Sequence, residues 1–268
     1  MPQPGLLALF GSGETSTQGR KVHDYLMSRL PVPVQVAILE TPAGFQPNAE
    51  GVNQKIAQFL EKSLQNFQPA ITLVAARRKG SAFDPDDPTI CAPIGRADYI
   101  LAGPGSPTYT ARHLRDTRAW ELVRARLAAG ATLAFASAAA LALGRYVLPV
   151  YEIYKAGADL SWEPGLELLP AWDVAIIPHW NNTEGGAGLD TNHCYMGAER
   201  FARLTALLPA STAVVGVDEH TACILDVREG TGLVLGVGAV TVRRGGTEEV
   251  FRAGTTFPLA RLGVPAAG

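Results

Sequence analysis

The chain has 268 residues, a formal net charge of −2 and a charged fraction of 18%. Its hydrophobic fraction of 47% is typical of a globular protein and excludes a disordered chain. The charge balance does not favour nucleic acid, which requires a basic face, and no stretch approaches the roughly 20 apolar residues of a membrane helix. The length suits one α/β domain that spans residues 1–268.

The cysteines and the start of the chain bear on its compartment. Cys91, Cys194 and Cys223 are odd in number and far apart, which argues against a disulfide framework and for a reducing environment. The first apolar run, Leu6–Phe10, is short and has no basic leader, unlike a secretory signal. We therefore expect a cytoplasmic protein that does not enter a membrane.

From the N-terminus onward, apolar runs alternate with helix-like stretches. We expect strands at 6–10, 34–39, 71–76, 99–102, 131–136 and 174–177, and helices at 17–30, 48–64 and 107–128. Strands and helices that alternate at this spacing indicate βαβ units and a parallel sheet. The expected strands are continuous apolar runs, as in sheets that helices cover on both faces.

After about residue 212 the pattern changes to short strands joined by glycine-containing turns. We expect these strands at 213–217, 222–227, 233–237 and 239–242, as antiparallel hairpins. The predicted fold is a three-layer α/β sandwich of the flavodoxin-like kind. It has a mostly parallel central sheet and antiparallel C-terminal strands.

Chemically useful residues follow several of the expected parallel strands. In open parallel sheets, ligands bind beyond the carboxyl ends of the strands. The segments that should meet at this edge are Gly11–Glu14, Thr41–Gly44, Gly103–Ser106, Ser137 and Pro178–His179. A serine and a histidine are among them, and a serine nucleophile requires a general base such as histidine.

The turn before the third expected helix suits an oxyanion. Ser106 is a good N-cap and Pro107 a good first helical residue. The glycines at 103 and 105 let backbone N–H groups approach a ligand closely, at a helix end that favours negative charge. An ordinary strand-to-helix turn would have the same residues.

The base also needs an orienting acid, and the sequence leaves its identity open. Glu152 lies between Ser137 and His179 in the chain; Asp159, Asp173, Asp218 and Glu219 are the other candidates. The segment 178–194 holds two histidines, two acidic residues and Cys194, but its spacing matches no standard metal motif. We expect a glycine-rich loop over the site, with no metal and no cofactor.

Several of these segments together give the chain a family resemblance. It resembles the cyanophycinase and aspartyl dipeptidase (dipeptidase E) family of serine peptidases, whose fold is like that of class I glutamine amidotransferases. The matched segments are Gly11–Glu14, Gly103–Ser106, Phe135–Ala140 with Leu143–Gly144, His179 with Arg200–Leu204, and Gly216–Ala222. The last segment is the most specific match, and the resemblance spans about residues 5 to 240.

The resemblance implies a serine–histidine–acid triad that acts on a small peptide. Carried over, the triad is Ser137, His179 and Glu152, and the oxyanion donors are the N–H groups of Gly105 or Ser106 and of Ala138. We assign Glu14, Asn181 and Glu219 to the same oxyanion and substrate-binding set. Arg145, Lys155 and Arg200 could meet a substrate carboxylate. The sequence leaves the oligomeric state open, with a homodimer among the alternatives.

The chain also departs from the family pattern. Phe135 and Ala139 stand where the nucleophile turn of the family has glycines, and a positive φ at either position would be costly. The alternative to a peptidase is therefore a weakened or inactive member of the fold that binds a small molecule or a partner. A glutamine amidotransferase would need a cysteine at position 137, so we rank it low.

Overall fold

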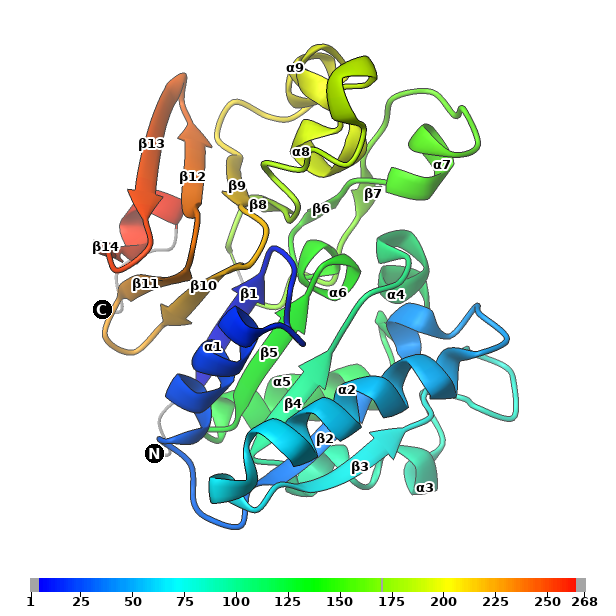
Figure 1. Ribbon diagram of the computed structural model, residues 1–268. Helices are drawn as coiled ribbons and strands as arrows, with labels where there is room; N and C mark the ends of the chain where they lie inside the picture. The colour runs from blue at the N-terminus through cyan, green and yellow to red at the C-terminus, as the bar shows by residue number, and fades with distance from the viewer. Residues whose placement is uncertain (1–4, 170, 264–268) are drawn as a thin grey trace.

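The computed structural model describes residues 5–169 and 171–263 (Figure 1). Residues 1–4, 170 and 264–268, which the predicted domain included, lie outside the described residues. Two β-sheets form the centre of the molecule. The larger, eight-stranded sheet has the order β14 (Thr256–Pro258), β11 (Thr231–Gly236), β10 (Thr221–Asp226), β1 (Leu6–Phe10), β5 (Thr132–Ala136), β4 (Tyr99–Ala102), β2 (Gln35–Leu39) and β3 (Ala70–Val74).

The larger sheet joins a parallel half to an antiparallel half. Strands β1, β5, β4, β2 and β3 run parallel, whereas β10, β11 and β14 continue the sheet antiparallel on the far side of β1. Strand β1 is therefore the junction, with β5 on one side and β10 on the other. Ser137 directly follows the carboxyl end of β5, which lies beside the carboxyl end of β1.

Helices cover both faces of the larger sheet because its side chains alternate between the faces. On one face, Ala8 and Phe10 pack with residues of α1 (Thr17–Met27) and α2 (Ala49–Ser63). On the other, Leu7 and Leu9 belong to the apolar cluster that contains residues of α3 (Pro88–Cys91) and α5 (Arg118–Ala128). Figure 1 shows α1 and α2 together on the near face.

The smaller, six-stranded sheet was not anticipated as a separate layer. Its order is β13 (Thr247–Arg252), β12 (Ala239–Arg244), β9 (Ala213–Val217), β8 (Val174–Ile177), β6 (Tyr146–Val147) and β7 (Glu163–Pro164). The expected C-terminal strands thus divide between the two sheets. Helices α7 (Val150–Tyr154), α8 (Asn192–Tyr195) and α9 (Gly197–Thr205) lie near this sheet in Figure 1.

Gly11 is the point where the two sheets meet at the site edge. Its N–H donates to the carbonyl of Thr221, and its carbonyl accepts the N–H of His179 at 3.2 Å. A Cβ on Gly11 would lie 2.1 Å from the carbonyl oxygen of Asp218. Only glycine allows this close approach, and through it the end of β1 meets the ends of β8 and β9.

The predicted helix over 107–128 is in fact two helices. Helix α4 (Pro107–Leu114) ends before Asp116, which has a φ of 56°, and α5 restarts after Thr117. The Thr117 hydroxyl accepts the N–H of Trp120 at 3.3 Å and so acts as an N-cap. The apolar periodicity continues through both helices, which is why the sequence suggested one.

The fold class is confirmed: a mixed α/β protein with a mostly parallel central sheet, helices on both faces and antiparallel C-terminal strands. The remaining helical segments are α6 (Ala138–Ala142) and short 3-10 helices at Thr41–Ala43, Gln65–Phe67, Ile94–Arg96, Gly186–Gly188 and Leu259–Leu262. Among the residues described, none of the helices has the length and apolar character to cross a membrane.

Candidate active site

Ser137 occupies a strained turn between β5 and α6. Its φ of 52° and ψ of −119° are a combination that L-residues rarely adopt, and such strain persists only where the surrounding structure enforces it. The Ser137 N–H donates to the carbonyl of Phe10 at 3.1 Å. Although Ser137 is the N-cap of α6, its side chain makes no capping hydrogen bond, so the hydroxyl is free to turn toward His179.

The unfavourable φ falls on Ser137 itself and on neither of the positions that depart from the family pattern. Phe135 is fully buried in β5, and Ala139 is fully buried within α6. Neither is among the described residues with positive φ. The two replacements of glycine therefore leave the turn geometry intact, and the concern about strain at Phe135 does not hold for this structure.

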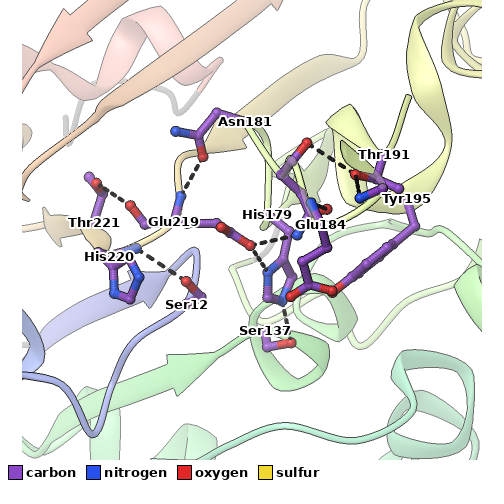
Figure 2. A network of polar contacts seen from close by, with 12 residues as sticks. Ser12, Ser137, His179, Asn181, Glu184, Thr191, Tyr195, Glu219, His220 and Thr221 are labelled. Atoms are coloured by element: carbon purple, nitrogen blue, oxygen red, sulfur yellow. Dashed lines mark hydrogen bonds and ion pairs between the residues drawn. The ribbon is translucent and has the colours of Figure 1, made fainter. Parts of the chain in front are cut away.

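Three side chains form a continuous hydrogen-bonded row (Figure 2). The Ser137 Oγ lies 2.9 Å from Nε2 of His179, and Nδ1 of His179 lies 3.0 Å from Oε1 of Glu219. An ionised carboxylate can only accept, so Nδ1 carries the ring proton and Nε2 accepts from the serine hydroxyl. This is the arrangement by which a histidine removes a proton from a serine.

The His179 backbone fixes the ring in this position. The residue follows β8 with a φ of 52°. Its carbonyl accepts the N–H groups of Asn182 and Cys194 at 3.2 and 3.1 Å. The ring of Tyr195 lies beside the imidazole with 5.8 Å between centroids.

Glu219 comes from the segment after β9, and the loop after His179 holds it. The buried Asn182 donates from Nδ2 to Oε1 of Glu219 at 2.8 Å, and Asn181 accepts the Glu219 N–H at 2.8 Å. The hydrogen bond from His179 holds the pKa of Glu219 below its ordinary value, partial burial opposes this, and Asn182 adds to the lowering. The carboxylate is thus kept ionised against the imidazole.

Glu152 does not occupy the position that the sequence analysis gave it. Its Oε1 accepts the Thr108 hydroxyl at 2.6 Å, and its Oε2 is buried without a hydrogen-bond partner among the described residues. Glu219 makes the contact with His179 instead. Glu152 lies nearer to Ser137 in the chain, but it lines a different cavity, together with Ser106 and Thr108.

Of the three predicted oxyanion donors, Ser106 differs from Gly105 and Ala138 in whether its N–H group is already bonded. The N–H of Ser106 donates to the carbonyl of Pro42 at 3.0 Å and is therefore not free. Gly105 and Ala138 both line the cavity beside Ser137, and within residues 5–169 and 171–263 their N–H groups have no acceptor. A Cβ on Gly105 would lie 1.8 Å from the Pro42 oxygen, so this close turn requires glycine.

Two other predicted residues support the site from outside the cavity. Asn181 is exposed and holds the Glu219 backbone, as described above. Burial raises the pKa of Glu14, while the charge of His179 opposes this rise. The carbonyl of Glu14 accepts from the buried His23 at 2.8 Å. Neither residue is part of the cavity wall.

A cavity of about 400 Å³ opens beside Ser137 and His179. Its wall includes residues that the sequence analysis did not select. These are the tyrosines at 151, 154 and 195, with Leu141 and Val150. Tyr195 donates its hydroxyl to Glu184 at 3.0 Å. These residues belong to no local sequence motif, so their place in the cavity wall could not be predicted. It follows only from the packing of α6, α7 and the loop after His179.

The alternatives based on a metal or a cysteine receive no geometric support. The part of the chain that the structure describes contains no group of three or more His, Cys, Asp or Glu side chains arranged to hold a metal ion. Cys194 lines the cavity, but burial raises the pKa of its thiol to about 12. A thiol with such a pKa is a poor nucleophile near neutral pH.

Comparisons with known proteins support the fold. No protein-family model matches the chain, and a search of curated proteins finds no match. A crystal structure of a peptidase from an acI-B1 Actinobacterium matches with a TM-score of 0.75 and 22% identity, over 95% of this chain and 97% of that one. A candidate Peptidase E protein from Listeria monocytogenes EGD-e matches with a TM-score of 0.56 and 16% identity, over 90% and 98%. The chain therefore shares the fold of these two proteins.

Proposed function

We propose that the chain is a serine hydrolase, and specifically a peptidase that acts on a small peptide. Ser137 attacks the carbonyl, His179 takes the serine proton and passes it to the leaving amine, and Glu219 stabilises the imidazolium. A water molecule that His179 deprotonates then cleaves the resulting acyl-enzyme, which releases the acid and returns the proton to Ser137. The N–H groups of Gly105 and Ala138 receive the developing oxyanion. The observation that carries the proposal is the continuous row of hydrogen bonds from Ser137 to Glu219.

Two further observations support this function. Ser137 keeps its strained φ, and among the described residues its hydroxyl has no hydrogen-bond partner except His179. In addition, both structural neighbours are described as peptidases or candidate peptidases. We include the relation to cyanophycinase and aspartyl dipeptidase, and to the glutamine amidotransferase-like fold, in the proposal.

Labelling with a fluorophosphonate probe tests the nucleophile. The full chain should be labelled at Ser137, and Ser137→Ala should abolish the labelling. Hydrolysis of a library of short peptides, followed by mass spectrometry, should show cleavage that the same substitution removes. An unlabelled wild-type chain with no cleavage would instead support a catalytically silent member of the fold.

A matched pair of variants tests the assignment of the acid. Glu219→Gln should lower the rate of labelling and of hydrolysis by roughly 10²-fold or more, because the imidazole loses its orienting charge. Glu152→Gln should leave both rates near those of the wild type, since a glutamine can still accept the Thr108 hydroxyl. Loss of activity in Glu152→Gln but not in Glu219→Gln would indicate that Glu152, and not Glu219, is the acid of the triad.

A further inference from the structure

The cavity beside Ser137 extends along one face of helix α6. Ala138 and Leu141, one helical turn apart, both line it, and Val150, Tyr151 and Tyr154 of α7 form the facing wall. A peptide carbonyl placed between Ser137 and the N–H groups of Gly105 and Ala138 would lie at one end of this cavity. The side chain of that residue would then point between α6 and α7.

The depth of the cavity is apolar. Leu141 is 1% exposed, Val150 5% and Cys194 4%, and Pro107 is also buried. Burial keeps the Cys194 thiol neutral, as described above. An apolar side chain can pack against Leu141 and Val150 there, whereas a carboxylate at that depth would lose its hydration without a buried cation to compensate, because Lys155 of the wall is exposed.

The charged groups of the wall lie at its exposed rim. Lys155 is exposed, and its Nζ lies 4.7 Å from the centre of the Tyr151 ring. Glu184 is exposed and accepts the Tyr195 hydroxyl. Charges in contact with solvent contribute little to binding, because water and salt screen them.

The two arginines that could have met a substrate carboxylate are engaged elsewhere. Arg145 lies 3.9 Å from Asp173 and is not part of the cavity wall. Arg200 donates to the carbonyls of Met196 and Tyr195 at 2.7 and 3.1 Å. Arg200 therefore stabilises the backbone that carries Tyr195, and it is not part of the cavity wall.

The tyrosines give this wall an aromatic surface. The rings of Tyr154 and Tyr195 lie 5.4 Å apart, and Tyr195 also contacts His179. Tyr151 forms the adjoining part of the wall. Aromatic walls of this kind favour aliphatic and aromatic side chains through large contact areas and ring stacking.

We propose that this cavity selects peptides in which the residue that supplies the attacked carbonyl has a large apolar or aromatic side chain, and that it discriminates against an acidic one. The inference rests on the proposed serine hydrolase function and names its substrate class. It differs from the aspartyl preference that the family resemblance suggests, because the described cavity wall holds no buried cation.

Substrates that differ only in this residue test the proposal. We would measure kcat/KM of the full chain on matched peptides with leucine, phenylalanine, alanine or aspartate at that position. Leucine and phenylalanine should exceed aspartate by roughly 10²-fold, since the apolar side chains gain contacts and the carboxylate has no partner. A higher kcat/KM for the aspartyl peptide would overturn the proposal.

Two variants separate the apolar depth from the charged rim. Val150→Phe should lower the ratio of kcat/KM for the phenylalanyl peptide to that for the alanyl peptide by roughly tenfold, because it narrows the cavity. The ratio compares two substrates of one variant, so a general loss of folding does not affect it. Lys155→Ala should change the leucyl and aspartyl rates by the same factor; a selective loss of aspartyl cleavage would contradict the proposal.

A binding measurement keeps the specificity testable if the chain does not turn over any peptide. Calorimetric titration with N-acetyl-leucine and N-acetyl-aspartate compares the two side chains without catalysis. Tighter binding of N-acetyl-leucine, lost in Val150→Phe, would support the apolar cavity even where fluorophosphonate labelling fails. Equal or tighter binding of N-acetyl-aspartate would overturn it. The two proposals can therefore fail separately.

Discussion

Ser137 combines a chemically useful hydroxyl with an unfavourable backbone conformation. A φ of 52° with a ψ of −119° costs on the order of 1–3 kcal/mol for a residue with a Cβ. The neighbouring strand and helix enforce this conformation, since the Ser137 N–H bonds to Phe10 and its carbonyl accepts from Leu141. The strain is thus located in the residue that we propose as the nucleophile.

Replacing this serine by glycine should therefore stabilise the fold. We expect Ser137→Gly to raise the free energy of unfolding by about 1 kcal/mol. Glycine relieves the backbone strain of the folded state, and this gain exceeds the cost of the greater conformational entropy of glycine in the unfolded chain. Urea unfolding measures this, and Ser137→Ala, which keeps the Cβ, is the control. Both variants should lose fluorophosphonate labelling. A Ser137→Gly variant that is less stable than Ser137→Ala would contradict the assignment of strain.

His23 is a second residue whose environment has a measurable consequence. It is fully buried, and burial lowers its pKa from the ordinary 6.5 to about 4, while its hydrogen bond to the Glu14 carbonyl opposes this shift. A carbonyl can only accept, so Nε2 carries the proton and Nδ1 accepts from the Tyr99 hydroxyl, 2.6 Å away. The neutral ring thus satisfies both partners.

The pKa of His23 predicts acid sensitivity of the fold. Between pH 6.5 and about 4 the unfolded chain binds a proton that the folded chain excludes, so stability falls as the pH is lowered through this range. The full loss amounts to about 3 kcal/mol. Urea unfolding at several pH values should show a shallower decline in His23→Gln than in the wild type. An identical slope in the two proteins would exclude this role for His23.

At the scale of the element, the turn before α4 is held by close contacts. It brings Gly105 against the Pro42 carbonyl and places the Ser106 hydroxyl as N-cap, accepting the Tyr109 N–H at 3.2 Å. The Ser106 N–H donates to the Pro42 carbonyl, whereas Gly105 lines the cavity and its N–H has no acceptor among the described residues. In the proposed mechanism this turn supplies one oxyanion donor, and its close packing on the 3-10 helix at Thr41–Ala43 holds that donor in place.

Substitution of two glycines should distinguish this turn from an ordinary helix. In Gly105→Ala the new Cβ would meet the Pro42 oxygen, so the turn must move and activity should fall by roughly 10²-fold, the effect of losing one oxyanion donor. A Cβ on Gly51 of α2 would meet nothing within 4 Å, so Gly51→Ala should raise the free energy of unfolding by about 1 kcal/mol. Peptide hydrolysis and urea unfolding give both results, and full activity in Gly105→Ala would exclude this donor.

At the scale of the whole molecule, the site exists because two sheets meet. Ser137 follows a strand of the larger sheet, whereas His179 and Glu219 follow β8 and β9 of the smaller one. Gly11 joins them through its contacts with the His179 N–H and the Asp218 carbonyl. The distance between Ser137 and His179, the proposed nucleophile and base, therefore depends on the separation of the sheets.

A methyl group at the junction should disturb both the fold and the site. We expect Gly11→Ala to lower the free energy of unfolding by at least about 2 kcal/mol and to slow labelling of Ser137, because the sheets must separate. Gly188→Ala is the control, since a Cβ there would meet nothing within 4 Å. Chemical denaturation and probe labelling measure the two effects. Unchanged labelling in Gly11→Ala would show that the junction does not set the site geometry.

Much of the architecture follows from local patterns in the sequence. The expected strands at 6–10, 99–102, 174–177 and 213–217 match β1, β4, β8 and β9, since buried strands are read directly from continuous apolar runs. The division of the C-terminal strands between two sheets was not predicted. Neither was the break between α4 and α5, because periodicity does not say which strands pair or where a helix ends.

The sequence by itself determined the α/β class and selected Ser137 and His179, because both follow continuous apolar runs that read as strands. It placed both residues at the edge of one parallel sheet, whereas β8, which precedes His179, belongs to the smaller sheet. Only the tertiary structure decided between Glu152 and Glu219 as the partner of His179. Glu152 is 15 positions after Ser137 and Glu219 is 82 after it, so separation along the chain favoured the wrong residue. The contact between His179 and Glu219 forms at the end of the smaller sheet, where it meets the larger one. Long-range packing of the two sheets determines this contact, and no local sequence motif predicts it.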